Sequence, residues 1–209
     1  LPGGDAAARW PVQAAAGFLA TLPQLPDLHS PPFSFPKRYD DACDLLRRGV
    51  RCYPSTSMGR LFDTIAALCG FTRPITFEGQ AAIYLEHLAR QAGEVTPYPF
   101  PFVDNELDFR PLLAAVLRDR QRGRDIAAIA RAFHEAVAHA ICSVAHHYRE
   151  VYGVSHVVLS GGVFQNMLLL TRVHQLLGQT RVWVNRIVPP NDGGISLGQA
   201  ALVAVRDMS

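Results

Sequence analysis

Hydrophobic residues recur at helical spacing through two stretches of the first 152 positions. In residues 126–152 the apolar side chains fall three or four positions apart, at Ile126, Ile129, Phe133, Val137, Ile141, Val144 and Tyr148. Residues 58–68 repeat the spacing with Met58, Leu61, Phe62, Ile65 and Leu68, and Gly70 follows as a stop signal. Stripes of this kind predict amphipathic helices that bury one face.

Weaker patterns predict the remaining helices of this part of the chain. An alanine-rich helix is expected over 6–22, capped by Asp5 and interrupted at Pro11, and a short one over 40–48. Residues 78–92 are also expected to be helical, with Ala81, Ile83, Leu85 and Leu88 mostly buried. Prolines mark residues 23–36 as a linker, and in the irregular segment 93–110 an edge strand pair is expected around Val103 and Leu107.

The last third changes to a strand, glycine-rich loop, helix pattern that occurs twice. Residues 157–159 are β-branched or apolar and run into Ser160-Gly161-Gly162-Val163, and a helical pattern opens at Asn166. Residues 181–185 lead through Pro189-Pro190-Asn191-Asp192-Gly193-Gly194 into a second helical pattern from Ile195. Such loops let backbone amides approach an anion, so two of them side by side at strand ends predict a phosphate-binding crevice. The alternative is that paired glycines only make tight turns.

Composition narrows the class of protein without deciding it. The 209 residues, 49% of them hydrophobic, suffice for one domain or two small packed lobes, and a net charge of +2 argues against nucleic acid as a ligand. The four cysteines form no CxxC pair, and there is no signal peptide and no apolar run of about 18 residues. We therefore expect a cytoplasmic protein with no membrane association.

The histidines of residues 126–152 do not have the spacing of a metal site. His139 lies five positions after His134, whereas two ligands on one helix face require a spacing of four. We expect His134, His139, His146 and His147 to lie on the polar face of the helix.

Several blocks occur together in this chain. They are Leu1-Pro2-Gly3-Gly4-Asp5, Ser57-Met58-Gly59-Arg60-Leu61-Phe62-Asp63, Glu78-Gly79-Gln80-Ala81-Ala82, Ser160 to Asn166 and Asn191 to Ala200. In combination they closely resemble the C-terminal part of the carbamoyl-transfer domain of the HypF family, which matures [NiFe] hydrogenases. The resemblance covers essentially the whole chain.

This resemblance implies a fold and a reaction. The fold is α/β, a helix-rich portion of the two-lobed nucleotide-binding class that includes actin, chaperone ATPases and sugar kinases (ASKHA). HypF proteins convert carbamoyl phosphate and ATP to carbamoyl-adenylate, then transfer the carbamoyl group to a C-terminal cysteine thiol of the partner HypE. A bound metal, with Fe, Mg and Zn all open, would stabilise the departing AMP.

The resemblance also implies roles for particular residues. Asp63 matches the carboxylate that accepts hydrogen bonds from the nucleoside hydroxyls, and an ionised carboxylate suits a ribose diol because it only accepts. Its alternative role is a charge on the helix surface. Gly79 matches the glycine that admits the nucleoside. Glu78 is implied to touch the ribose, with a first-turn carboxylate as its alternative role.

In the last third, the resemblance implies that Gly161 and Gly162 face the phosphates and that Asn166 contacts the nucleoside. For Asn166 the alternative is a helix-start residue that bonds its own backbone. Asp192 matches a metal ligand that supplies a hard oxygen, and its alternative role is a helix N-cap.

The departures from the family pattern are informative too. The family's other metal ligands, a His-x-x-x-His pair and a further aspartate, precede the first block and do not occur in this sequence. We therefore expect residues 1–209 to be the C-terminal part of such a domain, with a mainly helical part at 1–150 and a strand-loop-helix part at 151–209. Such a chain would need the N-terminal half as a partner and would expose apolar surface where that half docks.

Other functions remain open. A TsaD-like transferase acting on tRNA and an O-carbamoyltransferase acting on a small molecule share the fold class. A sugar kinase or ATPase of that class would need a catalytic base and a first phosphate loop, both expected outside this chain. A non-catalytic docking lobe would use the same loops only structurally, and would tolerate loss of Asp63 and Asp192.

Overall fold

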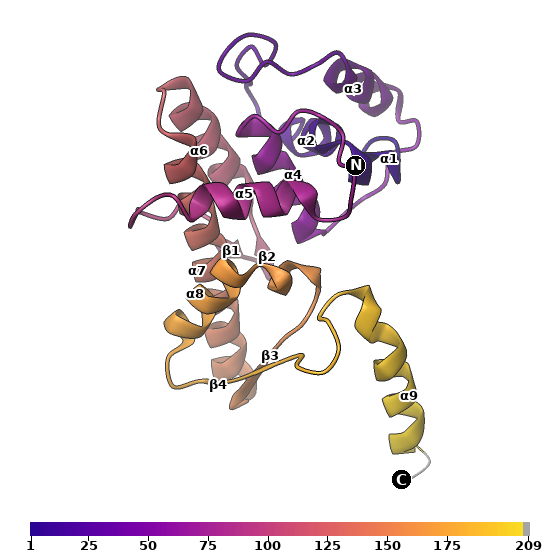
Figure 1. The fold of residues 1–209 in the computed structure, drawn as a ribbon, viewed down its shortest axis with the longest axis vertical. Helices are drawn as coiled ribbons and strands as arrows, with labels where there is room; N and C mark the ends of the chain where they lie inside the picture. Colours follow the sequence, from indigo (N-terminus) through magenta and orange to yellow (C-terminus); the bar gives the residue numbers. More distant parts are fainter. Residues whose placement is uncertain (207–209) are drawn as a thin grey trace. The chain divides into compact units, whose positions relative to one another are not determined.

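The computed structural model describes residues 1–206, which divide into two compact units (Figure 1). Unit 1 comprises Leu1–Ala140, and unit 2 begins at Ile141. The division falls inside the longest helix, α7 (Ile126–Tyr152).

Unit 1 is helical and is built around α4. Its elements are α1 (Ala6–Arg9), α2 (Pro11–Leu19), α3 (Arg38–Arg48), α4 (Met58–Leu68), α5 (Gln80–Ala89), β1 (Phe102–Val103), β2 (Glu106–Leu107), α6 (Arg110–Gln121) and the first half of α7. Helices α2, α5 and α6 all pack against α4. Helix α4 also contacts α7, where the ring of Phe62 on α4 meets that of Phe133 on α7 edge-on, with centroids 4.7 Å apart. The predicted bounds of α4 and α7 are confirmed.

The first helices show how local sequence sets the element ends. The predicted break at Pro11 is confirmed, because proline occupies the first position of α2, where its missing N–H costs nothing. Asp5 stands at the N-cap position of α1 but its side chain makes no capping hydrogen bond, so that prediction was wrong. Helix α2 ends at Leu19, ahead of the proline-rich linker.

The sequence predictions for α5 and α6 differ from the structure. Ile83 was expected to be buried but is 56% exposed, because Ala81, Leu85 and Leu88 form the inward stripe of α5 and Ile83 lies off it. Helix α6 was not predicted, although its buried residues Leu112, Leu113, Val116 and Leu117 have helical spacing. The expected pair around Val103 and Leu107 is confirmed as the antiparallel hairpin β1–β2.

Unit 2 contains the predicted strand-loop-helix repeats. After the end of α7 come β3 (His156–Leu159), the 3₁₀ turn η1 (Gly162–Gln165), α8 (Met167–Leu177), β4 (Arg181–Val184), the 3₁₀ turn η2 (Asp192–Gly194) and α9 (Ile195–Arg206). Strands β3 and β4 pair in parallel, from His156 opposite Arg181 to Leu159 opposite Val184. The described strands of this unit form a two-stranded parallel sheet, connected through α8 as a parallel pair requires.

One face of this small sheet is covered and the other is open. Leu159 is buried, as are Leu169, Val173 and Leu177 of α8. On the opposite face Val158 and Trp183 lie side by side in register and are 68% and 63% exposed. Helix α9 also exposes apolar residues, namely Ile195, Leu197, Leu202, Val203 and Val205. Unit 2 therefore exposes apolar surface, and its use for docking stays a prediction.

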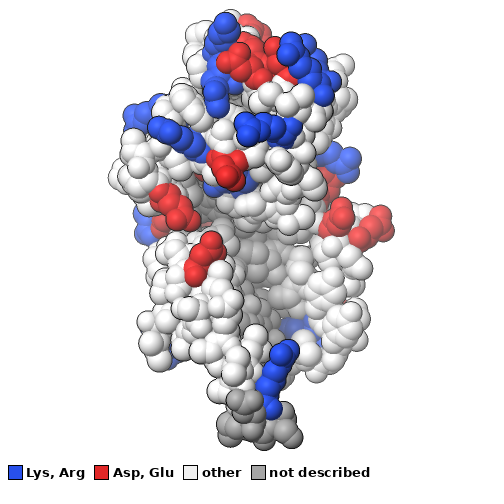
Figure 2. Space-filling view, turned by 90° about the vertical axis from the view of Figure 1, so that its right-hand side faces the viewer, with Lys and Arg blue, Asp and Glu red and all other residues white. Residues whose placement is uncertain are grey.

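Charge is distributed unevenly along the chain. On the face shown in Figure 2, charged side chains gather over unit 1, whereas the surface of α9 is almost uncharged because Arg206 is the sole charged residue of its sequence. Among the described residues, no helix combines the length and the hydropathy that a membrane span needs.

His134 lies in the core, not on the polar face where we placed it. It is 2% exposed, its Nδ1 lies 2.8 Å from the carbonyl oxygen of Ala130, and its ring meets that of Phe62 edge-on. Burial lowers the pKa of His134 to about 4, because the cation would be poorly solvated there. His139, His146 and His147 are more exposed, as expected.

The buried imidazole predicts an acid-sensitive core. Between pH 6.5 and about 4 the unfolded chain binds a proton at residue 134 that the folded chain does not, so the free energy of unfolding falls as the pH falls. The loss attributable to His134 is about 3 kcal/mol over this window. Urea unfolding of the wild type and of His134→Gln at pH 7.5 and pH 4.5 measures it. Stability curves that run parallel for the two proteins would contradict this account.

Candidate functional site

The two glycine-rich loops of unit 2 lie side by side. The backbone N–H of Gly161 donates to the carbonyl oxygen of Pro190 at 2.7 Å, and a Cβ built on Gly162 would lie 3.6 Å from the Cβ of Asn191. Parallel pairing explains this, because it places the carboxyl ends of β3 and β4 at the same edge of the sheet. The predicted juxtaposition of the loops is confirmed.

Different glycines of these loops are required for different reasons. Gly161 has φ 108° and ψ 154°, a conformation that favours glycine, and a Cβ there would meet nothing within 4 Å. Gly194 has no such φ, but a Cβ on it would lie 2.7 Å from the carbonyl oxygen of Pro189. Packing alone therefore explains Gly194, whereas the space beside Gly161 is open.

Asn166 caps a helix in the structure, whereas Asp192 does not. Asn166 is buried and caps α8, since its Oδ1 accepts a hydrogen bond from the N–H of Leu169 at 2.9 Å. Its alternative role is thus observed, and a nucleoside contact remains a prediction. Asp192 is exposed at the start of η2, and the capping role belongs to Asn191, whose Oδ1 accepts from the N–H of Gly193 at 3.1 Å.

A metal centre needs more than this chain's Asp192. Within residues 1–206 no group of three His, Cys, Asp or Glu side chains is placed to hold a metal ion. One exposed carboxylate is a poor match for Fe, Mg or Zn, which take several ligands. The described residues therefore do not by themselves fit the metal that the sequence resemblance implies.

Asp63 is a buried carboxylate in unit 1. It is 4% exposed on α4, and its Oδ2 lies 2.8 Å from Nη2 of Arg60. Although the two charges are within ion-pair distance, neither Asp63 Oδ2 nor Arg60 Nη1 makes a hydrogen bond, and both atoms are buried. Burial raises the pKa of Asp63 to about 6, and Arg60 acts in the opposite direction. The carboxylate therefore has acceptor capacity that the protein does not use.

Glu78 and Gly79 form the turn that leads into α5. Glu78 is exposed. Gly79 is the N-cap residue of α5 with φ 77°, and a Cβ there would meet nothing within 4 Å. The glycine thus serves a left-handed backbone conformation and leaves open space beside it.

The predicted residues belong to two separate sets. Asp63, Glu78 and Gly79 lie in unit 1, and the remaining residues, Gly161, Gly162, Asn166 and Asp192, lie in unit 2. No role was predicted for Arg60 from the sequence. Its position three residues before Asp63 on a predicted helix was the signal that could have identified the pair.

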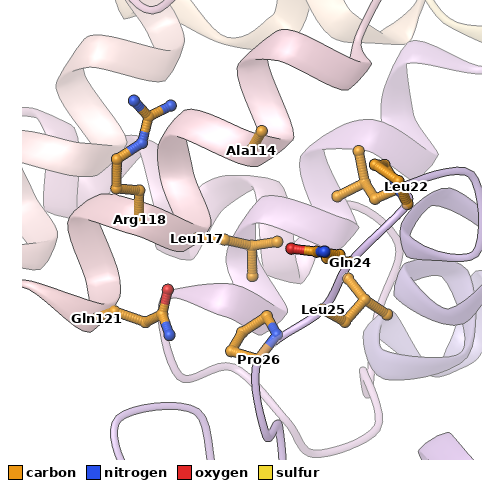
Figure 3. Close-up of a pocket in the computed structure, with 9 residues that line it drawn as sticks. Leu22, Gln24, Leu25, Pro26, Ala114, Leu117, Arg118 and Gln121 are labelled. Atoms are coloured by element: carbon orange, nitrogen blue, oxygen red, sulfur yellow. The ribbon is translucent and has the colours of Figure 1, made fainter.

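A pocket of about 350 Å³ in unit 1 contains none of these residues. It lies between the linker after α2 and helix α6, and its lining is Leu22, Pro23, Gln24, Leu25, Pro26, Ala114, Leu117, Arg118 and Gln121. In Figure 3, Leu117 lies in the middle, with Arg118 and Gln121 on one side and Leu22 and Leu25 on the other. The pocket is mainly apolar and does not coincide with the predicted nucleotide or metal residues.

Comparison with known proteins identifies the class. Residues 1–199 match the family described as the second subdomain of the Kae1-like domain of carbamoyltransferases, and the chain belongs to this family. The relatives that it resembles are HypF proteins, which confirms the resemblance found in the sequence.

Carbamoyltransferase HypF of Rhodobacter capsulatus is 34% identical over 169 residues, which cover 80% of this chain and 22% of that protein. HypF of Rhizobium leguminosarum bv. viciae is also 34% identical, over 211 residues that cover 96% of this chain and 26% of that protein. The chain thus spans about a quarter of the length of these relatives.

The fold matches solved structures of the same family. Full-length HypF in its phosphate- and nucleotide-bound form superposes with a TM-score of 0.81 at 32% identity, over 97% of this chain and 27% of that one. HypF of T. kodakarensis gives a TM-score of 0.81 at 26% identity, over 97% and 28%. The expected α/β, helix-rich fold is therefore that of a portion of HypF.

The close contact at Gly194 predicts a steric effect of substitution. Gly194→Ala would press a methyl group against the Pro189 carbonyl and is expected to destabilise unit 2 by about 1–3 kcal/mol. Gly198→Ala is the matched control, because this α9 glycine has open space around it and alanine favours helix. Thermal unfolding of both variants measures the difference, and equal melting temperatures would contradict the packing role of Gly194.

Proposed function

We propose that this chain is the nucleotide-binding part of a HypF-type carbamoyltransferase of [NiFe]-hydrogenase maturation. The observation that carries the proposal is the match of 97% of the chain to full-length HypF in a phosphate- and nucleotide-bound form. The juxtaposed loops after β3 and β4 support it, because phosphate groups commonly bind at the edge where parallel strands end. The fold would then be a helix-rich portion of the two-lobed ASKHA class.

The reaction is a carbamoyl transfer from carbamoyl-adenylate, which HypF-type proteins make from carbamoyl phosphate and ATP. The thiolate of a C-terminal cysteine in a HypE-type partner attacks the carbamoyl carbon, and the bond from that carbon to the AMP phosphate oxygen breaks. In this proposal the chain binds the adenylate. Gly161 and Gly162 face the phosphate, Asp63 accepts from the ribose hydroxyls, and Asn166, Gly79 and Glu78 border the nucleoside.

We assign no step to a metal. Asp192 is the one residue of this chain proposed as a metal ligand, and further ligands would have to come from outside the described residues.

The partner of unit 2 is proposed to be the first subdomain of the same Kae1-like domain, since a second subdomain implies a first. Parallel sheets are normally covered on both faces, yet Val158 and Trp183 are exposed. An apolar face of this kind suits a permanent interface between subdomains.

The alternative functions differ in the acceptor of the carbamoyl group and in whether the chain binds a nucleotide. A TsaD-like enzyme would use tRNA, and a small-molecule O-carbamoyltransferase would use a hydroxyl acceptor in place of a thiol. The net charge of +2 favours the thiol acceptor over tRNA, whose binding depends on phosphate neutralisation. A docking lobe without catalytic function would bind no nucleotide.

Loss of the Asp63 carboxylate is expected to weaken ATP binding through the ribose. Asp63→Asn should lower the affinity of this chain for ATP by about 10- to 100-fold, because a hydrogen bond to a charged acceptor is lost. The same variant should leave the affinity for 2′,3′-dideoxy-ATP unchanged, since that ligand has no diol. Calorimetric titration measures both affinities.

Asp41→Asn is the control for this titration, because Asp41 is exposed on α3. A wild-type chain that binds no ATP would contradict the nucleotide-binding role. Equal losses for ATP and the dideoxy analogue would contradict the ribose contact.

The open sheet face predicts a docking defect without a folding defect. Trp183→Lys should change the free energy of unfolding by less than about 0.5 kcal/mol, because the side chain is 63% exposed. It should nevertheless weaken association with the first subdomain of Rhodobacter capsulatus HypF at least about tenfold. Ile83→Lys, at a similarly exposed apolar position of unit 1, is the control. Unchanged association of Trp183→Lys would exclude this face as the docking surface.

A further inference from the structure

Arg60 and Asp63 form an isolated pair at the edge of the core of unit 1. They lie one turn apart on α4, with Nη2 of Arg60 2.8 Å from Oδ2 of Asp63. The Asp63 side chain is 5% exposed, whereas that of Arg60 is 21% exposed. Arg60 is therefore the member of the pair that still reaches solvent.

The pair has unused hydrogen-bonding capacity on both sides. Asp63 Oδ2 is a buried acceptor without a hydrogen bond, and Arg60 Nη1 is a buried donor without one. Buried polar atoms are rarely left in this state, and a functional role is one explanation for such exceptions. One donor next to one acceptor is also the pattern that complements a hydroxyl group, which both donates and accepts.

Arg60 is the charge that opposes protonation of Asp63. Burial favours the neutral carboxyl, and Arg60 favours the carboxylate. Helix α2 contributes no charged residue. The ionisable residues of the other helices on α4 are Tyr84, Glu86 and His87 of α5, Arg110, Arg118, Asp119 and Arg120 of α6, and Arg131, His134, Glu135 and His139 of the unit 1 part of α7. None of these acts appreciably on Asp63.

The protonation state matters because it decides which hydrogen bonds Asp63 can make. A carboxylate accepts from two hydroxyl groups, whereas a protonated carboxyl uses one oxygen as a donor. A ribose diol presented to the neutral form would lose one of its acceptors.

We propose that Arg60 is a positioning residue for the nucleoside subsite. Arg60 keeps Asp63 in the form that accepts hydrogen bonds and aligns it for the ribose diol. This inference rests on the proposed nucleotide-binding function. It adds Arg60 to the residues of the subsite, and it implies that nucleotide binding weakens at low pH.

The first test needs no ligand. The carboxyl carbon of Asp63 is followed by NMR from pH 4 to 9 in the wild type, Arg60→Lys and Arg60→Met of the full 209-residue chain. Arg60→Met, which keeps the length of the side chain, should raise the midpoint of the Asp63 titration by about one pH unit, and Arg60→Lys should restore most of the wild-type value. An unchanged midpoint in Arg60→Met would overturn the proposal.

The second test is the pH profile of ATP binding by calorimetry. In the wild type the affinity for ATP should fall as the pH drops through about 6, because the Asp63 carboxylate becomes protonated there. In Arg60→Met this decline should begin about one pH unit higher, which makes binding about fivefold weaker than wild type at pH 6. Arg122→Met, an exposed arginine after α6, is the control and should follow the wild type.

The outcomes separate the two proposals. A wild-type chain that binds no ATP at any pH removes the nucleotide-binding function and this role with it. A chain that binds ATP with the same pH profile in Arg60→Met as in the wild type retains that function and refutes the role of Arg60.

Discussion

The burial of α4 is the constraint on which unit 1 depends. Helices α2, α5 and α6 pack against it, and Phe62 joins it to α7. Because the helix is buried from Leu61 to Leu68 without interruption, it carries Asp63 into the core along with its apolar residues. The protein thus holds a carboxylate where burial disfavours its charge, and it supplies a single arginine one turn away as compensation. A fold selected for stability alone would place an apolar residue there.

In unit 2 the corresponding constraint is parallel pairing. Two parallel strands cannot be joined by a tight turn, so α8 must intervene, and both strands then end at the same edge. That geometry brings Gly161 against Pro190 although the residues are far apart in sequence. It also leaves one face of the sheet uncovered, with Val158 and Trp183 exposed. The parallel pairing therefore accounts for the candidate phosphate edge, and the uncovered face is the apolar surface proposed for docking.

Features that depend on local periodicity were predictable from the sequence, and features that depend on tertiary surroundings were not. The bounds of α4 and α7 followed from long apolar stripes, and the break at Pro11 followed from proline's missing donor. His134 was misplaced because its burial depends on Phe62 and Phe133, which no local pattern reveals. Helix α6 was not predicted because its apolar stripe spans only Leu112 to Leu117, with charged residues at both ends of the helix. The adjacency of the glycine loops was predictable, because it follows from the order of elements.

The glycines show where motif and physics diverge. Gly194 stands in a block that matches the HypF family, yet the nearby Pro189 carbonyl is sufficient to exclude any larger residue. At Gly161 and Gly79 the conformation selects glycine, but nothing within 4 Å fills the space beside either backbone. Glycine next to occupied space serves the fold, whereas glycine next to open space leaves the backbone approachable by a ligand. By this criterion Gly79 in unit 1 and Gly161 in unit 2 each leave space that a ligand could fill, whereas Gly194 serves the packing of the loop after β4.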